Sequence, residues 1–212
     1  MRFRARDPEA TKADILASAR VEFAKAGLSG ARVDKIAEQS GANKRMIYHY
    51  FEGKENLFAA VVEDAYAAIR SREKLLRLDE LGPLEAIERL VRFTWEYYLE
   101  VPEFVTLVNS ENLHEARHII GNKLLRKLQK AYVDSVATIL KRGEEAGVFR
   151  PGIDAVQLCV TIAGQGFYYL SNCHTGGVLF GFSFMTKDAL AKRLAFNLDT
   201  IRRLVLIDPG AS

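Results

Sequence analysis

The positions of proline constrain the fold of this chain more than any other feature. All five prolines stand where a helical pattern of apolar residues begins or ends, as expected for a residue that interrupts helix interiors. No long stretch alternates apolar and polar residues with the period of two that a half-buried strand needs. The sequence therefore predicts an all-α protein.

Capping residues and glycines place the individual helices. Asp7 is a candidate cap for a first helix that begins at Pro8, and Gly27 ends that helix. The expected helices span residues 8–26, 33–40, 44–50 and 54–78, a helix that begins at Gly82-Pro83 and ends by Pro102, a short segment 102–113, a long helix up to Gly147, 155–172, and a last helix before Pro209. We expect residues 175–186, which are rich in Gly and Phe, to form a loop.

Composition and charge narrow the class of partner. With 212 residues, 49% of them apolar, the chain can bury a core. The net charge of 30 − 27 = +3 comes from the N-terminus, because residues 1–54 hold 11 Lys and Arg against 7 Asp and Glu, and residues 55–212 hold 19 against 20. A basic end on a nearly neutral body favours a polyanionic partner.

Two further features indicate the compartment. The only cysteines, Cys159 and Cys173, cannot build a disulfide framework or a four-cysteine zinc site, which favours a reducing cytoplasm. No signal peptide is expected, since three arginines in the first ten residues are followed by no apolar region.

Residues 155–186 lack Asp, Glu, Lys and Arg, but neutral polar residues interrupt them. They therefore predict a buried helix and a loop rather than a membrane span.

Two short helical patterns joined by a turn that contains Gly41 predict a helix-turn-helix unit. Apolar residues of both segments can pack inward, and this leaves Lys44, Arg45, Tyr48 and His49 outward on the second helix. Long hydrogen-bond donors at a helix N-terminus can reach guanine edges or phosphates in a major groove. An isolated basic residue is usually only a solvated charge, so it is the combined pattern that indicates DNA binding.

Residues 27–57, G-L-S-G-A-R-V-D-K-I-A-E-Q-S-G-A-N-K-R-M-I-Y-H-Y-F-E-G-K-E-N-L, resemble the DNA-binding region of TetR-type (TetR/AcrR) transcriptional regulators. The resemblance implies a helix-turn-helix DNA-binding domain at 1–53 and a larger helical effector-binding and dimerisation domain at 54–212. It further implies that Asn43, Lys44 and Arg45 approach bases, that Tyr48, His49 and Tyr50 contact bases or phosphates, and that Lys54 holds a phosphate.

Arg32 departs from this pattern, because the family commonly has a Ser or Thr there that caps the second helix and binds a phosphate. An arginine side chain cannot accept the amide hydrogen bonds of the first turn, but it can bind a phosphate itself.

The rest of the chain resembles the family only weakly, at the turn Glu144–Gly152 and in helix order. Two apolar stripes on the helices 155–172 and 190–205 are expected to pair two subunits as a four-helix interface. The interface residues would be Leu158, Ile162, Gly166, Leu194, Leu198, Ile201 and Val205. Aromatic residues mixed with neutral hydrogen-bonding groups are typical of effector pockets, and here they are Trp95, Tyr98, Asn109, Asn112, Tyr168 and Asn172.

One segment offers a rival interpretation as an enzyme. His114–His118 reads H-E-A-R-H, which matches the helical H-E-x-x-H zinc-peptidase signature. Arg117 between the two histidines and the lack of a recognisable third ligand argue against it. A solvated helix end is favoured, and a weak metal or effector contact through His114 or His118 is the other alternative. We expect no catalytic site, metal or cofactor.

The motif residues predict sequence-specific binding of double-stranded operator DNA. The family resemblance further implies a repressor that binds a palindromic operator as a homodimer and is released by a small-molecule effector. The competing classes are a metalloenzyme and a helical adaptor that binds only protein. The sequence leaves open the effector, the operator, and whether the outcome is repression or activation.

Overall fold

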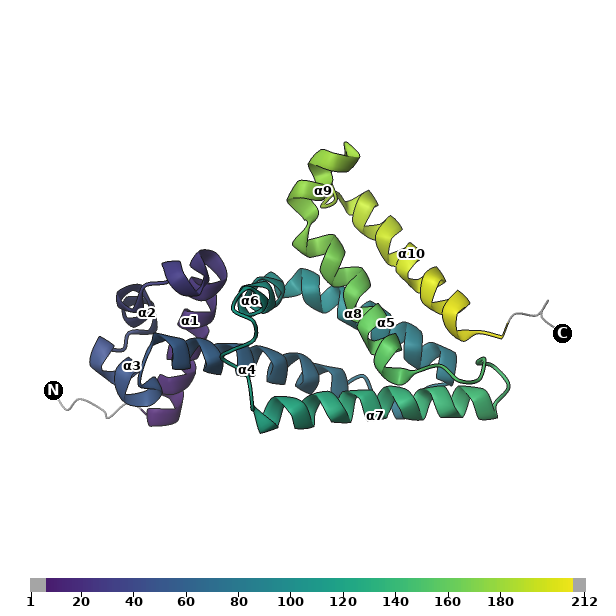
Figure 1. Cartoon of the computed structure of the whole chain (residues 1–212), viewed down its shortest axis with the longest axis horizontal. Coiled ribbons are helices and arrows are strands. Elements are labelled where there is room, and N and C mark those ends of the chain that lie inside the picture. Colours follow the sequence, from purple (N-terminus) through teal and green to yellow (C-terminus); the bar gives the residue numbers. More distant parts are fainter. Residues whose placement is uncertain (1–6, 208–212) are drawn as a thin grey trace. The chain divides into compact units, whose positions relative to one another are not determined.

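The computed structural model describes residues 7–207, and within this range every regular element is a helix apart from an isolated bridge between Phe149 and Leu206 (Figure 1). This confirms the predicted all-α class. Pro209 and the N-terminal arginines lie outside the described residues. No helix in the described range is both long and apolar enough to span a membrane.

The chain divides into two compact units. The first unit takes the described residues up to Ala67 together with Glu103–Asn122. It contains α1 (Pro8–Gly30), α2 (Val33–Ser40), α3 (Lys44–Phe51), the first part of α4 (Lys54–Lys74) and nearly all of α6 (Pro102–Leu113). The second unit takes Ala68–Pro102 and the residues from Lys123 onward. It contains the end of α4, the 3₁₀ helix η1 (Leu78–Glu80), α5 (Pro83–Glu100), α7 (Lys123–Glu145), α8 (Ala155–Ser171), α9 (Cys173–Phe180) and α10 (Lys187–Val205).

The first unit is built around the aromatic pair Phe23 and Phe58, whose rings meet edge to face with centroids 5.1 Å apart. Ile15, Ile36 and Ile47 from the three N-terminal helices are buried with this pair. Because Phe58 lies on α4, the start of α4 belongs to the core of the helix-turn-helix helices. The unit therefore extends beyond the boundary expected at residues 53 and 54.

Local signals in the first unit act as the sequence predicts. Asp7 caps α1 through a hydrogen bond from the backbone N–H of Glu9 at 3.1 Å. Gly27 breaks the helical backbone with φ 65°, although a further helical turn continues to Gly30. A left-handed backbone of this kind is accessible to glycine without strain.

In the second unit, α5 packs against α7, α8 and α10. The core contains Ile87 and Leu90 of α5, Ile139 of α7 and Phe149, all nearly inaccessible to solvent. A Cβ added to Gly143 would lie 1.9 Å from the ring of Phe149. Position 143 is therefore glycine because the Phe149 ring occupies the space of a side chain.

The segment expected to be a loop differs from the prediction, because it contains the short helix α9. Phe184, beyond α9, is buried and stacks on Tyr169 of α8 with ring centroids 4.4 Å apart. A Cβ on Gly176 would lie 2.6 Å from the Phe184 ring. The glycine that suggests a loop in the sequence thus lets an aromatic ring pack against α9. The helix expected at 54–78 also ends earlier, at Lys74.

Candidate nucleic-acid interface and ligand pocket

The start of α3 is fixed by Asn43 and by the turn before it. The side chain of Asn43 caps α3, since its Oδ1 accepts the backbone N–H of Met46 at 2.9 Å. Gly41 has a left-handed backbone with φ 63° and ends α2. Gly41 and Asn43 therefore set the turn between α2 and α3, and the capped N-terminus of α3 carries partial positive charge.

The two faces of α3 divide as the sequence predicts. Ile47 and Phe51 are buried. The predicted DNA contacts Lys44, Arg45, Tyr48 and His49 are exposed, and Tyr50 is half-buried. The exposed face thus gathers three basic or potentially basic groups and a phenol around one helix, in an arrangement that suits a polyanion.

Lys44 is already paired in this structure. Its Nζ lies 3.0 Å from Oδ1 of Asp34 on α2, and both side chains are more than half exposed. The Asp34 carboxylate raises the pKa of Lys44 above its ordinary value. A phosphate that approaches Lys44 therefore competes with Asp34, a residue that sequence reasoning did not single out.

Lys54 also has partners within the first unit. Its Nζ donates to the backbone carbonyl oxygens of Ser29 and Ala31, each at 3.2 Å. The ammonium group therefore helps to hold the chain at the end of α1, in addition to any role toward a phosphate. This structural role was not predicted.

Arg32 precedes α2 and, as expected, provides no side-chain cap. The backbone N–H of Arg32 instead donates to Oε1 of Glu22 at 3.0 Å. Glu22 is buried on α1, with 3% of its surface exposed, and Lys35 lies 4.0 Å from the same oxygen. Sequence reasoning missed Glu22, although a glutamate close to the apolar stripe of α1 is a signal that could have been used.

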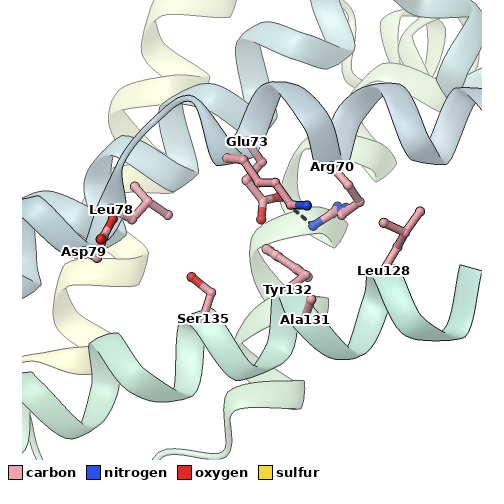
Figure 2. A pocket seen from close by; sticks show the side chains of 9 residues that line it. Arg70, Glu73, Leu78, Asp79, Leu128, Ala131, Tyr132 and Ser135 are labelled. Carbon is pink, nitrogen blue, oxygen red and sulfur yellow. Dashed lines mark hydrogen bonds and ion pairs between the residues drawn. The ribbon is translucent and has the colours of Figure 1, made fainter.

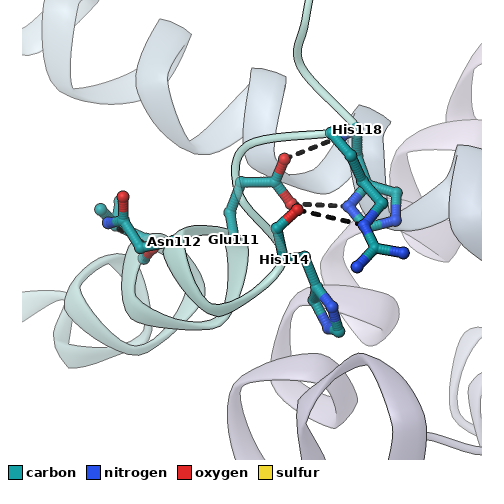
Figure 3. Close-up of polar contacts among 6 residues, drawn as sticks. Glu111, Asn112, His114 and His118 are labelled. Atoms are coloured by element: carbon teal, nitrogen blue, oxygen red, sulfur yellow. Dashed lines mark hydrogen bonds and ion pairs between the residues drawn. The ribbon is translucent and has the colours of Figure 1, made fainter.

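The segment that reads H-E-A-R-H is not a helix. α6 ends at Leu113, and Glu115 and Ala116 both have left-handed backbones with φ 58°. His118 instead faces Glu111, whose Oε2 lies 2.7 Å from its Nδ1 and whose Oε1 accepts its backbone N–H at 2.9 Å (Figure 3). The segment therefore lacks the arrangement of the zinc-peptidase signature, in which two histidines lie one helical turn apart, and the interpretation as a zinc peptidase is wrong. Among residues 7–207 no group of three or more His, Cys, Asp or Glu side chains is placed to hold a metal ion.

The Glu111–His118 pair has a structural setting. Only 4% of the Glu111 side chain and 8% of the His118 side chain are exposed. The His118 ring meets Phe58 of the first-unit core edge to face, at 5.3 Å between centroids, and His114 lies 5.5 Å away. The pair fixes the turn after α6 to α4.

A pocket of about 240 Å³ lies in the second unit between the end of α4 and α7 (Figure 2). It is lined by Arg70, Glu73, Lys74, Leu78, Asp79, Leu128, Ala131, Tyr132 and Ser135. Nη1 of Arg70 donates to Oε2 of Glu73 at 2.6 Å, and the Arg70 guanidinium lies 3.9 Å from the centroid of the Tyr132 ring. This geometry combines an ion pair with a cation–π contact.

Burial shapes the protonation of this pocket. Desolvation raises the pKa of Glu73 to about 7, although Arg70 opposes the shift. It also raises the pKa of Tyr132, and it raises that of Cys159 on α8 to about 11. Glu73 thus titrates near neutral pH, well above the ordinary range of a glutamate, while the phenol and the thiol stay neutral.

None of the six predicted effector residues lines this pocket. Trp95 and Tyr98 are buried in the second unit, where Trp95 packs on Tyr169 and Tyr98 on Phe167. Tyr168 is 63% exposed, and Asn172 donates to its carbonyl oxygen at 2.9 Å.

The other two predicted effector residues, Asn109 and Asn112, lie in the first unit. Asn112 is exposed and donates to the carbonyl oxygen of Val108 on its own helix. The six residues thus divide between the two units, with Trp95, Tyr98, Tyr168 and Asn172 in the second.

The predicted dimer residues lie inside the second unit. Five of them, Leu158, Ile162, Leu198, Ile201 and Val205, belong to its core, Leu194 packs against that core, and Gly166 lies under Tyr98. The stripe of α8 thus faces α5 and α7, and that of α10 packs on α5 and α8 of the same chain, so these side chains are buried within one subunit. Large apolar side chains do remain exposed elsewhere on these helices, namely Val156, Val160 and Tyr168 on α8 and Phe196 on α10.

Comparison with known proteins gives matches along most of the chain. Residues 15–61 match the family described as bacterial regulatory proteins, tetR family, and residues 83–201 match the tetracyclin repressor-like C-terminal domain. The HTH-type transcriptional repressor NicS of Pseudomonas putida is 37% identical over 200 residues, which cover 94% of each chain. The HTH-type transcriptional repressor SCO4008 of Streptomyces coelicolor is 36% identical over 156 residues, 73% of this chain and 75% of that protein.

A solved structure agrees on the fold. The ketosteroid transcriptional regulator KstR2 of Mycobacterium tuberculosis superposes with a TM-score of 0.67 at 19% identity, over 93% of this chain and 95% of that one. With the helix-turn-helix unit and the two matching family models, these findings show that the chain belongs to the TetR family of helix-turn-helix transcriptional regulators.

Proposed function

We propose that this protein represses transcription by binding a palindromic operator as a homodimer, and that a small-molecule effector releases it. The observation that carries the proposal is the exposed face of α3, where Lys44, Arg45, Tyr48 and His49 surround a helix capped by Asn43. The relatives NicS and SCO4008 are both named as repressors. Their descriptions support a role in the regulation of transcription.

On this proposal α3 enters the major groove. Asn43, Lys44 and Arg45 approach base edges, while Tyr48, His49 and the half-buried Tyr50 contact bases or phosphates. Arg32 and Lys54 lie near the ends of neighbouring helices and contact phosphates. A DNA target also implies a cytoplasmic location, in which the two cysteines stay reduced.

The surface that pairs two copies lies on the faces of α8 and α10 that this chain leaves uncovered. Val156, Val160, Tyr168 and Phe196 are each about half or more exposed. Large apolar residues grouped on a protein surface are typical of protein interfaces. A two-fold pairing of these helices would form a four-helix interface and would require operator half-sites one helical turn or more apart.

The effector site proposed here is the pocket between α4 and α7, in place of the residues predicted from the sequence. One end of α4 is buried with the helix-turn-helix helices through Leu57 and Phe58, and its other end supplies Arg70 and Glu73 to the pocket. A ligand that fits only one position of α4 lowers DNA affinity by its differential binding to the two states.

Fluorescence anisotropy tests the DNA-binding part of the proposal. The purified protein is titrated against DNA from upstream of its own gene and against a scrambled duplex of equal length, at near-physiological salt. We expect affinities that differ by about a thousandfold or more. Absence of salt-dependent binding to either duplex would favour an adaptor that binds only protein. Equal affinity for both would contradict operator recognition.

Sedimentation equilibrium tests the pairing. We expect a dimer for the natural sequence and a shift toward monomer when Val160 and Phe196, which are both more than 60% exposed, are replaced together by serine. A stable dimer in that variant would show that the interface lies elsewhere.

A further inference from the structure

The α4–α7 pocket contains an ion pair that is largely withdrawn from water. The Arg70 side chain is 14% exposed and the Glu73 side chain is 10% exposed. A pair in this setting loses most of its solvation, which makes it a poor source of stability compared with apolar side chains. Its position in the wall of a cavity, beside Leu78 and Leu128, suggests a role toward a ligand.

Glu73 is the member of the ion pair whose charge changes near neutral pH. The ionisable groups that surround it are Arg70 and Lys74 on α4, Asp79 in η1, Tyr132 on α7 and Cys159 on α8. Burial raises the pKa of Glu73 to about 7, whereas the raised pKa values of Tyr132 and Cys159 keep both groups neutral between pH 6 and pH 8.

The charges in the pocket follow from this protonation. When Glu73 is ionised, the two cations balance the two carboxylates. When Glu73 is protonated, Arg70 loses its partner carboxylate and the pocket carries an excess positive charge. A guanidinium binds a carboxylate in a planar, bidentate manner, so an incoming carboxylate can take the place of the Glu73 oxygens.

We propose that this pocket binds a small organic carboxylate with an apolar body, which replaces Glu73 at Arg70 while Glu73 takes up a proton from the solvent. The apolar body lies against Leu78, Leu128 and Ala131. A cationic ligand would be repelled by Arg70 and Lys74. A neutral ligand has no carboxylate that could replace that of Glu73 at Arg70. This inference deepens the proposed function and rests on it, because it names the chemical class of the effector.

The cavity volume limits the size of the ligand. An engineered cavity of about 150 Å³ binds benzene, so a pocket of about 240 Å³ has room for a benzene ring with one small substituent. Benzoate, benzamide and benzamidine are molecules of this kind with nearly the same shape, and they carry charges of −1, 0 and +1. They therefore serve as probes of nearly one shape that differ in charge and in hydrogen-bonding groups.

Isothermal titration calorimetry of the free protein at pH 7, in two buffers of different ionisation enthalpy, measures both affinity and proton exchange. We expect benzoate to bind at least about tenfold more tightly than benzamide and benzamidine not to bind. Because Glu73 titrates near neutral pH, binding of benzoate at pH 7 should be accompanied by uptake of a fraction of a proton. Benzoate affinity should fall about tenfold from pH 6 to pH 8, since at higher pH a proton must be added to Glu73.

Two variants and a control separate this coupling from a general effect on folding. Glu73→Gln should abolish the proton uptake and make benzoate affinity independent of pH, with binding at pH 8 tighter than in the natural protein. Arg70→Met should abolish benzoate binding. Glu80→Gln is the matched control, because Glu80 forms an exposed ion pair with Arg77 outside the pocket. Circular dichroism checks that each variant is folded.

Three results would overturn the proposal. They are equal binding of benzamide, benzoate binding without proton uptake, and no binding of either benzoate or the aliphatic carboxylate hexanoate. Operator affinity is measured separately for each probe. Benzoate that binds with the expected signatures but leaves operator affinity unchanged would refute the release step of the proposed function, and the ligand class would stand.

Discussion

Substitution of Asn43 tests both how α3 begins and what its N-terminus faces. Loss of an N-cap side chain costs ~0.5–2 kcal/mol. The Asn43–Met46 hydrogen bond is exposed to water and belongs to a helix of eight residues that is buried only through Ile47 and Phe51. We therefore expect Asn43→Ala to lower the free energy of unfolding by about 1 kcal/mol.

Two further substitutions separate the cap from the contact with DNA. Asn43→Ser and Asn43→Asp keep an oxygen that can accept the Met46 N–H, and a negative charge at a helix N-terminus adds ~0.3–1 kcal/mol of stability. The same negative charge would repel the phosphates proposed to approach this end of α3. Stability should therefore rank Asp at or above Asn, then Ser, then Ala, whereas operator affinity should be lowest for Asp.

Urea unfolding followed by circular dichroism gives the first ranking, and fluorescence anisotropy with operator DNA gives the second. Natural operator affinity in Asn43→Asp would refute the docking of the α3 N-terminus on DNA. Unchanged stability in Asn43→Ala would refute the energetic role of the cap. Because the two rankings are opposed, a general loss of fold cannot produce both.

Further substitutions test other parts of the structure. Arg45→Ala should weaken operator binding by about 1–3 kcal/mol in anisotropy titrations, and an equal loss on scrambled DNA would instead indicate a phosphate contact. Lys54→Ala should weaken binding to both duplexes and flatten the salt dependence, and it should also lower Tm, since its ammonium holds two carbonyl groups of the first unit; a changed sequence preference would contradict this. Phe149→Ala should cost about 3–5 kcal/mol in urea unfolding, with Phe149→Leu losing less, because the ring is fully buried against Gly143. The pKa of Glu73 is raised from 4.5 to about 7, so its contribution to stability is present below pH 4.5 and is lost as pH rises through 7, on the order of 3 kcal/mol at most; parallel pH profiles for the natural protein and Glu73→Gln would refute it.

The DNA-binding helices could be predicted because their signals are local. Asn43, Gly41 and Asp7 each act on residues within one turn, so their types determine where a helix begins or ends. The alternation of buried and exposed positions on α3 is equally local. Glu22 was missed because its partner, the N–H of Arg32, lies ten residues away across a turn.

The pocket and the interface depend on packing between distant segments. Arg70 and Tyr132 are 62 positions apart in the chain (132 − 70 = 62), and nothing near either residue indicates the contact. A helical stripe such as Leu158 and Ile162 shows which face is buried, but the same stripe can be buried by another helix of the same chain or by a second copy. The left-handed backbone at Glu115 and Ala116 likewise cannot be read from the letters H-E-A-R-H.

The pair between Lys44 and Asp34 has a consequence for how such a regulator finds its site. A genome offers a vast excess of random sequence, whose phosphates attract every exposed cation. On the proposed mode of binding, the Asp34 carboxylate occupies the place of a phosphate beside Lys44 in the free protein. On random DNA, Lys44 therefore gains little binding free energy when a phosphate replaces this carboxylate. The replacement of Asp34 becomes favourable only when Lys44 reaches a base edge while the other side chains of α3 make their own contacts. Asp34 on α2 would then shorten the residence time of the protein on random DNA. The protein would sample more sequence per unit time, and the loss of the Lys44–Asp34 pair would add to its discrimination against random DNA.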